Sequence, residues 1–264
     1  MPDFTAKDVQ ALRQATGAGM MDAKRALEAN DGDAEAAGQW LREKGLAKAA
    51  GRTDRENAEG AIAIASDGNV AALVELKAET DFSAKAADFT DLVQELADLV
   101  LAKGPDAVAE RADEIDQLKI TKKENIELGT VAHFEAAEGN VLDAYLHKQD
   151  GRGKVGVLVE CSGVTPEQAH EVALHIAFAK PSHLTRDEVP AEAVEKERAL
   201  LEEQTRNEGK PEQALPKIVE GKLSAFFKES VLMEQDLFGE KGRSVSQSLG
   251  GGTVVRFVVA SVGA

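Results

Sequence analysis

The chain has 264 residues, 43% of them apolar, and its 47 acidic residues outnumber its 31 basic ones to give a formal net charge of −16. This charge repels phosphate backbones, so no nucleic-acid partner is expected, and it favours a partner with a positive patch. One cysteine, Cys161, and a beginning without a basic head or apolar stretch predict a cytoplasmic protein, and no apolar run is long enough to span a membrane.

The first fifty residues predict three short helices. Thr5 and Asp8 have the spacing of a capping box, and Asp33 is placed to cap the third helix. We therefore expect a small helical bundle over 1–50. The polar, small residues that follow predict a linker over 51–60.

Two alternating apolar runs come next, in AIAIASDGNVAALVELKAE. They surround Asp67 and Gly68, a pair typical of a hairpin turn. A segment with one apolar helical face follows and ends at KGP, residues 103–105. Together they predict a first unit of sheet and helix over 61–130.

The same order recurs over 131–189. NIELGTVAHFEA and NVLDAYLH flank a turn, EGN, VGVLVECSG supplies a further strand, and Thr165, Pro166 and Gln168 begin a helix. Aligning ALVELKAET with VLVECSGVT places Thr80 and Thr165 at the same strand-to-helix corner. We therefore expect a duplicated core of antiparallel sheet and helices.

The last part of the chain turns helical and highly charged. Two segments of 190–232, separated by NEGKP, carry a thin apolar seam that predicts an antiparallel helical hairpin. Residues 233–264 predict a short helix and a strand that returns to the second core unit. The predicted class is α+β, with a helical bundle, a duplicated antiparallel core and an inserted hairpin.

The motifs favour a binding protein over an enzyme. The five histidines lack zinc-ligand spacing and no second cysteine accompanies them, so no metal and no cofactor are expected. GRGKVG, at 151–156, lacks the order of a phosphate-binding loop and precedes a strand pattern. A hydrolase would need two carboxylates converging in one cleft, which the sequence does not indicate.

The corner after the first strand pair, ETDFSAK, places Phe82 where turns are usually polar. Thr80 or Asp81 can cap the following helix, so capping alone does not require an aromatic residue. Phe82 lies seven residues before Phe89, on the same helical face, and can simply extend the core. The alternative is a projecting probe, and residue type alone leaves both interpretations open.

Two long motifs make the chain resemble a known family. TGAGMMDAKRAL at 16–27 and ETDFSAK at 79–85, in this order and separation, resemble the signatures of bacterial elongation factor Ts. YLH before VGVLVE, and GKPEQALPKIVEG in the hairpin, extend the resemblance over nearly the whole chain. It implies a ubiquitin-associated-like fold for the N-terminal helices and nucleotide exchange on elongation factor Tu. A protein-interaction scaffold without exchange activity is the alternative.

The resemblance also implies the contact residues. The corner formed by Thr80, Asp81, Phe82 and Ser83 would enter the GTP-binding domain of elongation factor Tu and disturb the elements that hold the magnesium ion and phosphates of GDP. Further contacts, to this domain and another, would involve Met20, Met21, Lys24, His147, Leu232 and Met233. Each has a structural alternative, such as a core methionine or a solvated lysine. Whether two heterodimers pair into a dimer stays open.

The chain departs from the family pattern. Ser83 stands where valine is common, and we expect less apolar contact beside Phe82. Lys122 and Lys123 replace a common Ile-Gly pair, so no contact is transferred to them. After VASVGA we expect no counterpart of the C-terminal helical extension of some members, so no contact is transferred to such a tail.

Overall fold

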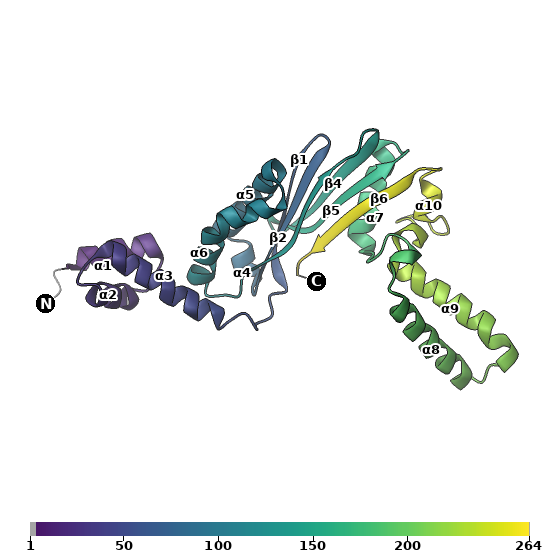
Figure 1. The fold of residues 1–264 in the computed structure, drawn as a ribbon, viewed down its shortest axis with the longest axis horizontal. Helices are drawn as coiled ribbons and strands as arrows, with labels where there is room; N and C mark the ends of the chain where they lie inside the picture. Colours follow the sequence, from purple (N-terminus) through teal and green to yellow (C-terminus); the bar gives the residue numbers. More distant parts are fainter. Residues whose placement is uncertain (1–3, 264) are drawn as a thin grey trace.

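The computed structural model describes residues 4–263, so residues 1–3 of the predicted N-terminal bundle and residue 264 of the predicted C-terminal segment lie outside the described residues. The molecule is elongated, with three helices at one end, a body of strands and helices, and a helical hairpin at the other end (Figure 1). The α+β class is confirmed as N-terminal helices followed by an antiparallel sheet with helices. The finer division into domains stays a prediction.

Three helices form the N-terminal end: α1 (Ala6–Thr16), α2 (Met20–Ala29) and α3 (Ala34–Ala50). The predicted capping box at Thr5 and Asp8 is present, and Asp33 caps α3 by accepting from two backbone amides. Their shared core is small and is filled largely by alanine and leucine, with Leu27 fully buried.

The strands form two three-stranded groups that meet at one point. One group has the order β3-β2-β1, made of β1 (Glu59–Asp67), β2 (Val70–Ala78) and β3 (Glu127–Glu135). In the other, β5 (Arg152–Ser162) pairs with both β4 (Asn140–Gln149) and β6 (Thr253–Ser261). All pairings are antiparallel, and a single pair, Ile62 with Gly153, joins β1 to β5.

The two groups also pack face to face. Their inner faces bury Ile62, Leu73 and Leu158 in one cluster. The approach is close at Gly156, because a Cβ there would lie 2.7 Å from the Ile62 side chain and 2.9 Å from that of Leu73. Larger residues at position 156 would therefore force the two groups apart.

Helices cover the outer faces. On the first group lie α5 (Ala87–Lys103) and α6 (Ala112–Lys122), and Phe89 of α5 is fully buried in the cluster between them and the strands. On the second group lie α7 (Pro166–Ala179) and the short α10 (Val245–Ser248). The body is thus built as helices, sheet, sheet and helices (Figure 1).

The structure differs from the sequence prediction at β3. The sequence pattern places NIELGTVAHFEA in the second unit, but β3 pairs with β2, for example His133 with Ala72, and not with β4. The turn EGN therefore carries the chain from one strand group to the other. The edge of β2 needs a hydrogen-bonding partner, and β3 supplies it.

A helical segment after α5 went unpredicted. The 3-10 helix η1 (Pro105–Arg111) and α6 bury few apolar side chains, among them Ile115 and Leu118. An apolar face this sparse does not give the helical periodicity on which sequence-based assignment depends.

The predicted hairpin is formed by α8 (Ala191–Asn207) and α9 (Leu215–Ser230), whose seam includes Leu201, Val219 and Leu223. Its two ends meet where it leaves the body, because the amide of Leu232 donates to the carbonyl of His183 at 2.9 Å. Three short 3-10 helices, η2 (Arg186–Glu188), η3 (Glu212–Ala214) and η4 (Leu232–Glu234), lie at its turns. No helix within residues 4–263 has the length and apolar character of a membrane span.

We predict that Lys123→Gly stabilises the protein. Lys123 ends α6 with φ 60° and ψ 32°, a left-handed conformation that costs a residue with a side chain roughly 1 to 2 kcal/mol. Glycine removes this cost, but about 0.5 to 1 kcal/mol of the gain is lost because glycine gives the unfolded chain more conformational entropy. The free energy of unfolding, measured by urea denaturation, should rise by up to about 1.5 kcal/mol.

The matched control is Lys123→Ala, which removes the same side-chain charge but keeps the strained backbone. It should be no more stable than the parent. Equal stabilisation by alanine would show that the lysine charge, and not the backbone, is responsible.

Candidate functional site

The corner that follows β2 is a single helical turn, α4 (Asp81–Ala84). Thr80 begins it from an extended conformation and accepts a hydrogen bond from the amide of Ser83 at 3.2 Å. The turn leaves the Phe82 side chain 84% exposed, whereas Phe89 is fully buried. The interpretation of Phe82 as an extension of the core is therefore wrong.

One carboxylate, that of Glu124, fixes the corner from below. Its Oε2 accepts from the backbone amides of Glu79 and Thr80, each at 3.1 Å. Its Oε1 accepts from the hydroxyl groups of Thr80 at 2.7 Å and Ser83 at 2.5 Å. Hydrogen bonds to an ionised acceptor are stronger than neutral ones. Four of them therefore hold this turn rigidly to Glu124, which follows Lys123 at the end of α6.

A buried arginine fixes the corner from the other side. The guanidinium of Arg152, with a side chain 1% exposed, donates to the backbone carbonyl of Asp81 at 3.0 Å and to Glu59 Oε2 at 2.5 Å. Lys154 also donates to Glu59 Oε2, at 3.2 Å. A buried charge needs such partners, and here the partners tie β5, β1 and the corner together.

The charge of Asp81 is held at the surface of the corner. Lys85, one turn later, donates to Asp81 Oδ2 at 2.7 Å. This hydrogen bond and the lysine charge hold the pKa of Asp81 below its ordinary value, and that of Lys85 above. Asp81 is therefore an anion at neutral pH, beside the exposed ring of Phe82.

Ser83 does not lie beside the Phe82 ring as expected. Its side chain is buried, with the residue 3% exposed, and it points to Glu124. A serine here therefore changes how the corner is anchored and leaves its outer surface unchanged.

The other predicted contact residues lie apart from the corner. Met20 and Met21, at the start of α2, are 48% and 59% exposed, and Lys24 is exposed beside Glu28. The methionines are thus outside the core of the N-terminal helices. His147 is exposed near the end of β4, with its Nδ1 3.4 Å from the Tyr145 hydroxyl.

The candidates after the hairpin have less free surface. Leu232 is fully buried under α7 with Leu237 and Val245, and Met233 is half-buried against the same cluster. The Leu232 side chain can offer no contact in this conformation.

The corner has no groups arranged for covalent chemistry. Within residues 4–263, no three His, Cys, Asp or Glu side chains are grouped to hold a metal ion. Cys161 is buried, and its burial raises the pKa of the thiol to about 12, so it is no nucleophile at neutral pH. What the arrangement can do is present an aromatic ring and a carboxylate rigidly to a partner.

Sequence reasoning missed the two residues that anchor the corner. Glu124 lies more than forty positions from Thr80 and Ser83, within the charged run KKEN, and no local pattern distinguishes it from a solvated residue. Arg152 lies two residues from Lys154 at the start of β5, and no local pattern indicates that its partner is the carbonyl of Asp81.

Comparison with known proteins agrees with the motif resemblance. Residues 79–264 match the family model described as Elongation factor TS. The chain is 44% identical to the elongation factor Ts of Clavibacter michiganensis subsp. michiganensis over the full length of both proteins. It is similar to that of Mycobacterium ulcerans, at 44% identity over 100% of this chain and 99% of the relative, and to that of Micrococcus luteus, at 43% over 94% and 93%.

We predict that Glu124→Gln loosens the corner. Glutamine keeps one acceptor oxygen but turns an amide donor toward groups that also donate, so the variant should lose about 1 to 3 kcal/mol of unfolding free energy. Amide hydrogen exchange at Phe82 and Ser83 should speed up by more than this global loss explains. Glu138→Gln, at an exposed position, is the matched control and should behave as the parent. Unchanged exchange at the corner in Glu124→Gln would contradict the anchoring role.

Proposed function

The chain belongs to the elongation factor Ts family, and we propose that it acts on its partner through the corner Thr80–Ser83. It is a nucleotide exchange factor for elongation factor Tu in translation elongation, a cytoplasmic factor and not an enzyme. The observation that carries the proposed role of the corner is the 84% exposure of the Phe82 ring on a turn anchored from two sides. An aromatic ring that is held in water on a rigid turn is explained by its burial in a partner protein.

In this proposal Phe82 enters the GTP-binding domain of elongation factor Tu and separates the elements that hold the magnesium ion and phosphates of GDP. Asp81, kept charged beside it, competes for hydrogen bonds in the same region. The anchored corner matters because a wedge must be stiffer than the structure it displaces. Glu124 and Arg152 supply that stiffness.

The energetics require more contacts than this one. Exchange by binding is reciprocal: if the factor weakens GDP binding by a given amount, GDP weakens the factor's binding equally. Burying a phenylalanine ring contributes about 1.5 to 3 kcal/mol, and each 1.4 kcal/mol is a factor of ten. Burial of Phe82 alone therefore accounts for a weakening of GDP binding by about one to two powers of ten.

We assign the remaining contacts to exposed residues outside the corner. Met20, Met21 and Lys24 offer one surface at the end of the N-terminal helices, and His147 offers another on the body for a further domain of elongation factor Tu. Because Leu232 is buried and Met233 is half-buried, they contact elongation factor Tu only if the partner reorganises the loop after the hairpin.

The finer domain division is part of the proposal. We take 1–50 as a ubiquitin-associated-like domain because α1–α3 share a core of their own. The two outer clusters support the proposed repeats over 61–130 and 131–189, although β3 (Glu127–Glu135) spans the boundary between the ranges and pairs with β2. Residues from the last part of the chain complete the second cluster. The hairpin spans 190–232, and 233–264 returns to the second sheet through β6.

We predict that Phe82→Ala slows the stimulated release of GDP from elongation factor Tu by about tenfold to a hundredfold, because the ring's burial free energy is lost. Since the ring is exposed in the free protein, unfolding free energy should change by less than about 0.5 kcal/mol. Release is measured with a fluorescent GDP analogue. Phe82→Leu, which keeps most of the apolar volume, should be intermediate, and parental rates in Phe82→Ala would refute the wedge.

A second comparison separates a direct role of Asp81 from support of its own turn. If Asp81 contacts the partner, Asp81→Ala should slow GDP release severalfold while Lys85→Ala does not slow it. If Asp81 serves only its hydrogen bond to Lys85, the two variants should be slowed equally. Equal slowing would therefore remove Asp81 from the contact surface.

A further inference from the structure

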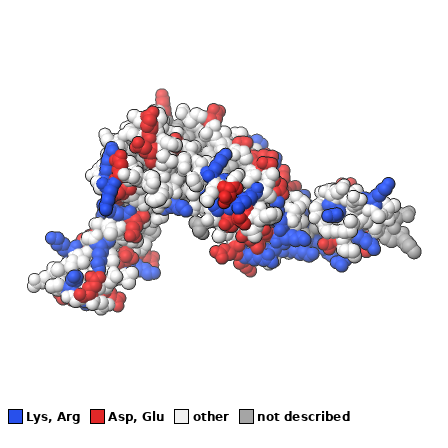
Figure 2. All heavy atoms as spheres, turned by 180° about the vertical axis from the view of Figure 1, so that it is seen from behind, with Lys and Arg blue, Asp and Glu red and all other residues white. Residues whose placement is uncertain are grey.

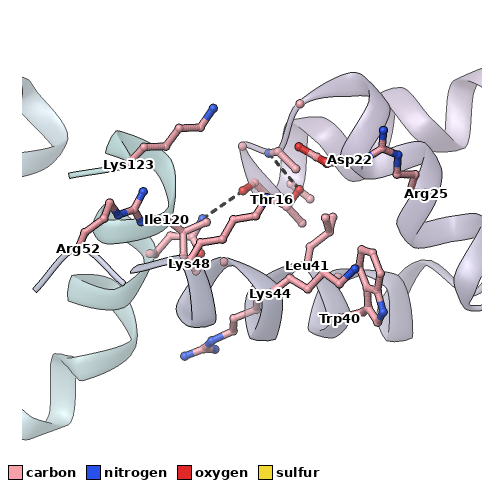
Figure 3. Close-up of a pocket in the computed structure, with 18 residues that line it drawn as sticks. Thr16, Asp22, Arg25, Trp40, Leu41, Lys44, Lys48, Arg52, Ile120 and Lys123 are labelled. Atoms are coloured by element: carbon pink, nitrogen blue, oxygen red, sulfur yellow. Dashed lines mark hydrogen bonds and ion pairs between the residues drawn. The ribbon is translucent and has the colours of Figure 1, made fainter. Parts of the chain in front are cut away.

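A cavity of about 630 Å³ lies where the N-terminal helices meet the body. Its walls come from the turn between α1 and α2, from one side of α3, and from the end of α6 (Figure 3). This volume falls within the roughly 300 to 1,000 Å³ of ordinary small-molecule sites. The corner at Phe82 takes no part in the lining.

The walls are joined to each other, so the cavity is preformed. Gln117 on α6 donates to the carbonyl of Thr16 at the end of α1, at 3.2 Å. Arg52 donates to the carbonyl of Lys119 at 3.0 Å. At Gly45 the backbone of α3 approaches the Ile120 side chain so closely that a Cβ would lie 2.8 Å from it.

The lining is basic in a strongly acidic protein. Six cationic residues line the cavity, against the single carboxylate of Asp22; they are Arg25, Arg42, Lys44, Lys48, Arg52 and Lys123. Arg42 pairs with Asp113, and Arg25 lies 3.9 Å from Asp22. The other four form no ion pair with any residue of 4–263. Figure 2 shows basic side chains gathered at the junction of the N-terminal helices and the body.

These cations are positioned on more than one wall. Lys44 and Lys48 lie along α3, Arg52 follows that helix, and Lys123 ends α6 on the facing wall (Figure 3). The bond from Arg52 to the Lys119 carbonyl holds its guanidinium in place, and the buried Nε of Arg52 has no partner. Cations on opposite walls favour a ligand with several negative charges.

An apolar part of the cavity accompanies the charge. Trp40 and Leu41 of α3 line it, and the Lys44 ammonium lies 3.8 Å from the centroid of the Trp40 ring. A flat or apolar group can pack on this ring once Lys44 turns to an incoming anion.

We propose that this cavity is a binding site for a small ligand that combines several phosphate groups with an apolar or aromatic part. Lys48, Arg52 and Lys123 bind the phosphates, and Trp40 packs on the remainder. The cavity is separate from the corner at Phe82, whereas Gly19, Asp22 and Arg25 of its lining adjoin the proposed contact residues Met20, Met21 and Lys24. Its occupation needs no partner protein.

The full-length protein, alone, is titrated with inorganic tripolyphosphate and with ATP by calorimetry. Trp40 is the one tryptophan of the chain, so its fluorescence reports directly on this cavity. We expect saturable binding of one equivalent, a change in Trp40 emission, tighter binding of ATP than of tripolyphosphate, and weakening as salt rises.

The variant Lys48→Gln/Lys123→Gln should bind at least tenfold more weakly. The control, Lys196→Gln/Lys217→Gln, removes two lysine charges from the helical hairpin and should bind as the parent does. Both should keep the parent's circular dichroism. Equal weakening in the two variants would show a general charge effect and overturn the site.

Absence of saturable binding in the parent would overturn the proposal outright. An acidic peptide that binds and changes Trp40 emission while both phosphate compounds fail would replace the small ligand with a protein segment, and would also overturn it. Because elongation factor Tu is absent from these experiments, their outcome does not depend on the role of Phe82.

Discussion

The anchoring of one helical turn by the carboxylate of Glu124 is the interaction on which the functional surface depends. Without it, two backbone amides and two hydroxyl groups at the corner would lose their acceptor. The turn would then no longer be held in one position. Arg152 completes the support by holding the Asp81 carbonyl from the opposite side. An exposed ring transmits force only when its base is fixed, and here both anchors are residues of the same folded body.

The two anchors also connect the corner to distant parts of the chain. Glu124 follows α6, which packs against the N-terminal helices at Gly45, whereas Arg152 begins β5 and reaches Glu59 on β1. Through these two residues the corner is connected to both strand groups and to the helix that contacts the N-terminal helices. This placement is consistent with a factor whose contacts to its partner are spread over separate surfaces yet must act together.

Most of the local structure could be predicted from the sequence because it rests on short-range chemistry. The capping box at Thr5, the turn at Gly68 and the helix start at Thr165 need only neighbours within a few residues. The pairing of β3 could not be predicted, because either strand group offers an edge and only the folded body decides between them. The corner could be recognised from its sequence motif, whereas the exposure of Phe82 is known only from the structure. The anchors depend on contacts across more than forty residues and had no sequence signal.

The closed base of the helical hairpin has a consequence for how this architecture can vary. Because the carbonyl of His183 meets the amide of Leu232, the body closes on itself without the helices between them. To the sheet, the hairpin is one long loop, and the entropic cost of closing a loop grows only slowly with its length. The arm is thus a module that evolution can lengthen, trim or exchange while the six strands keep their register.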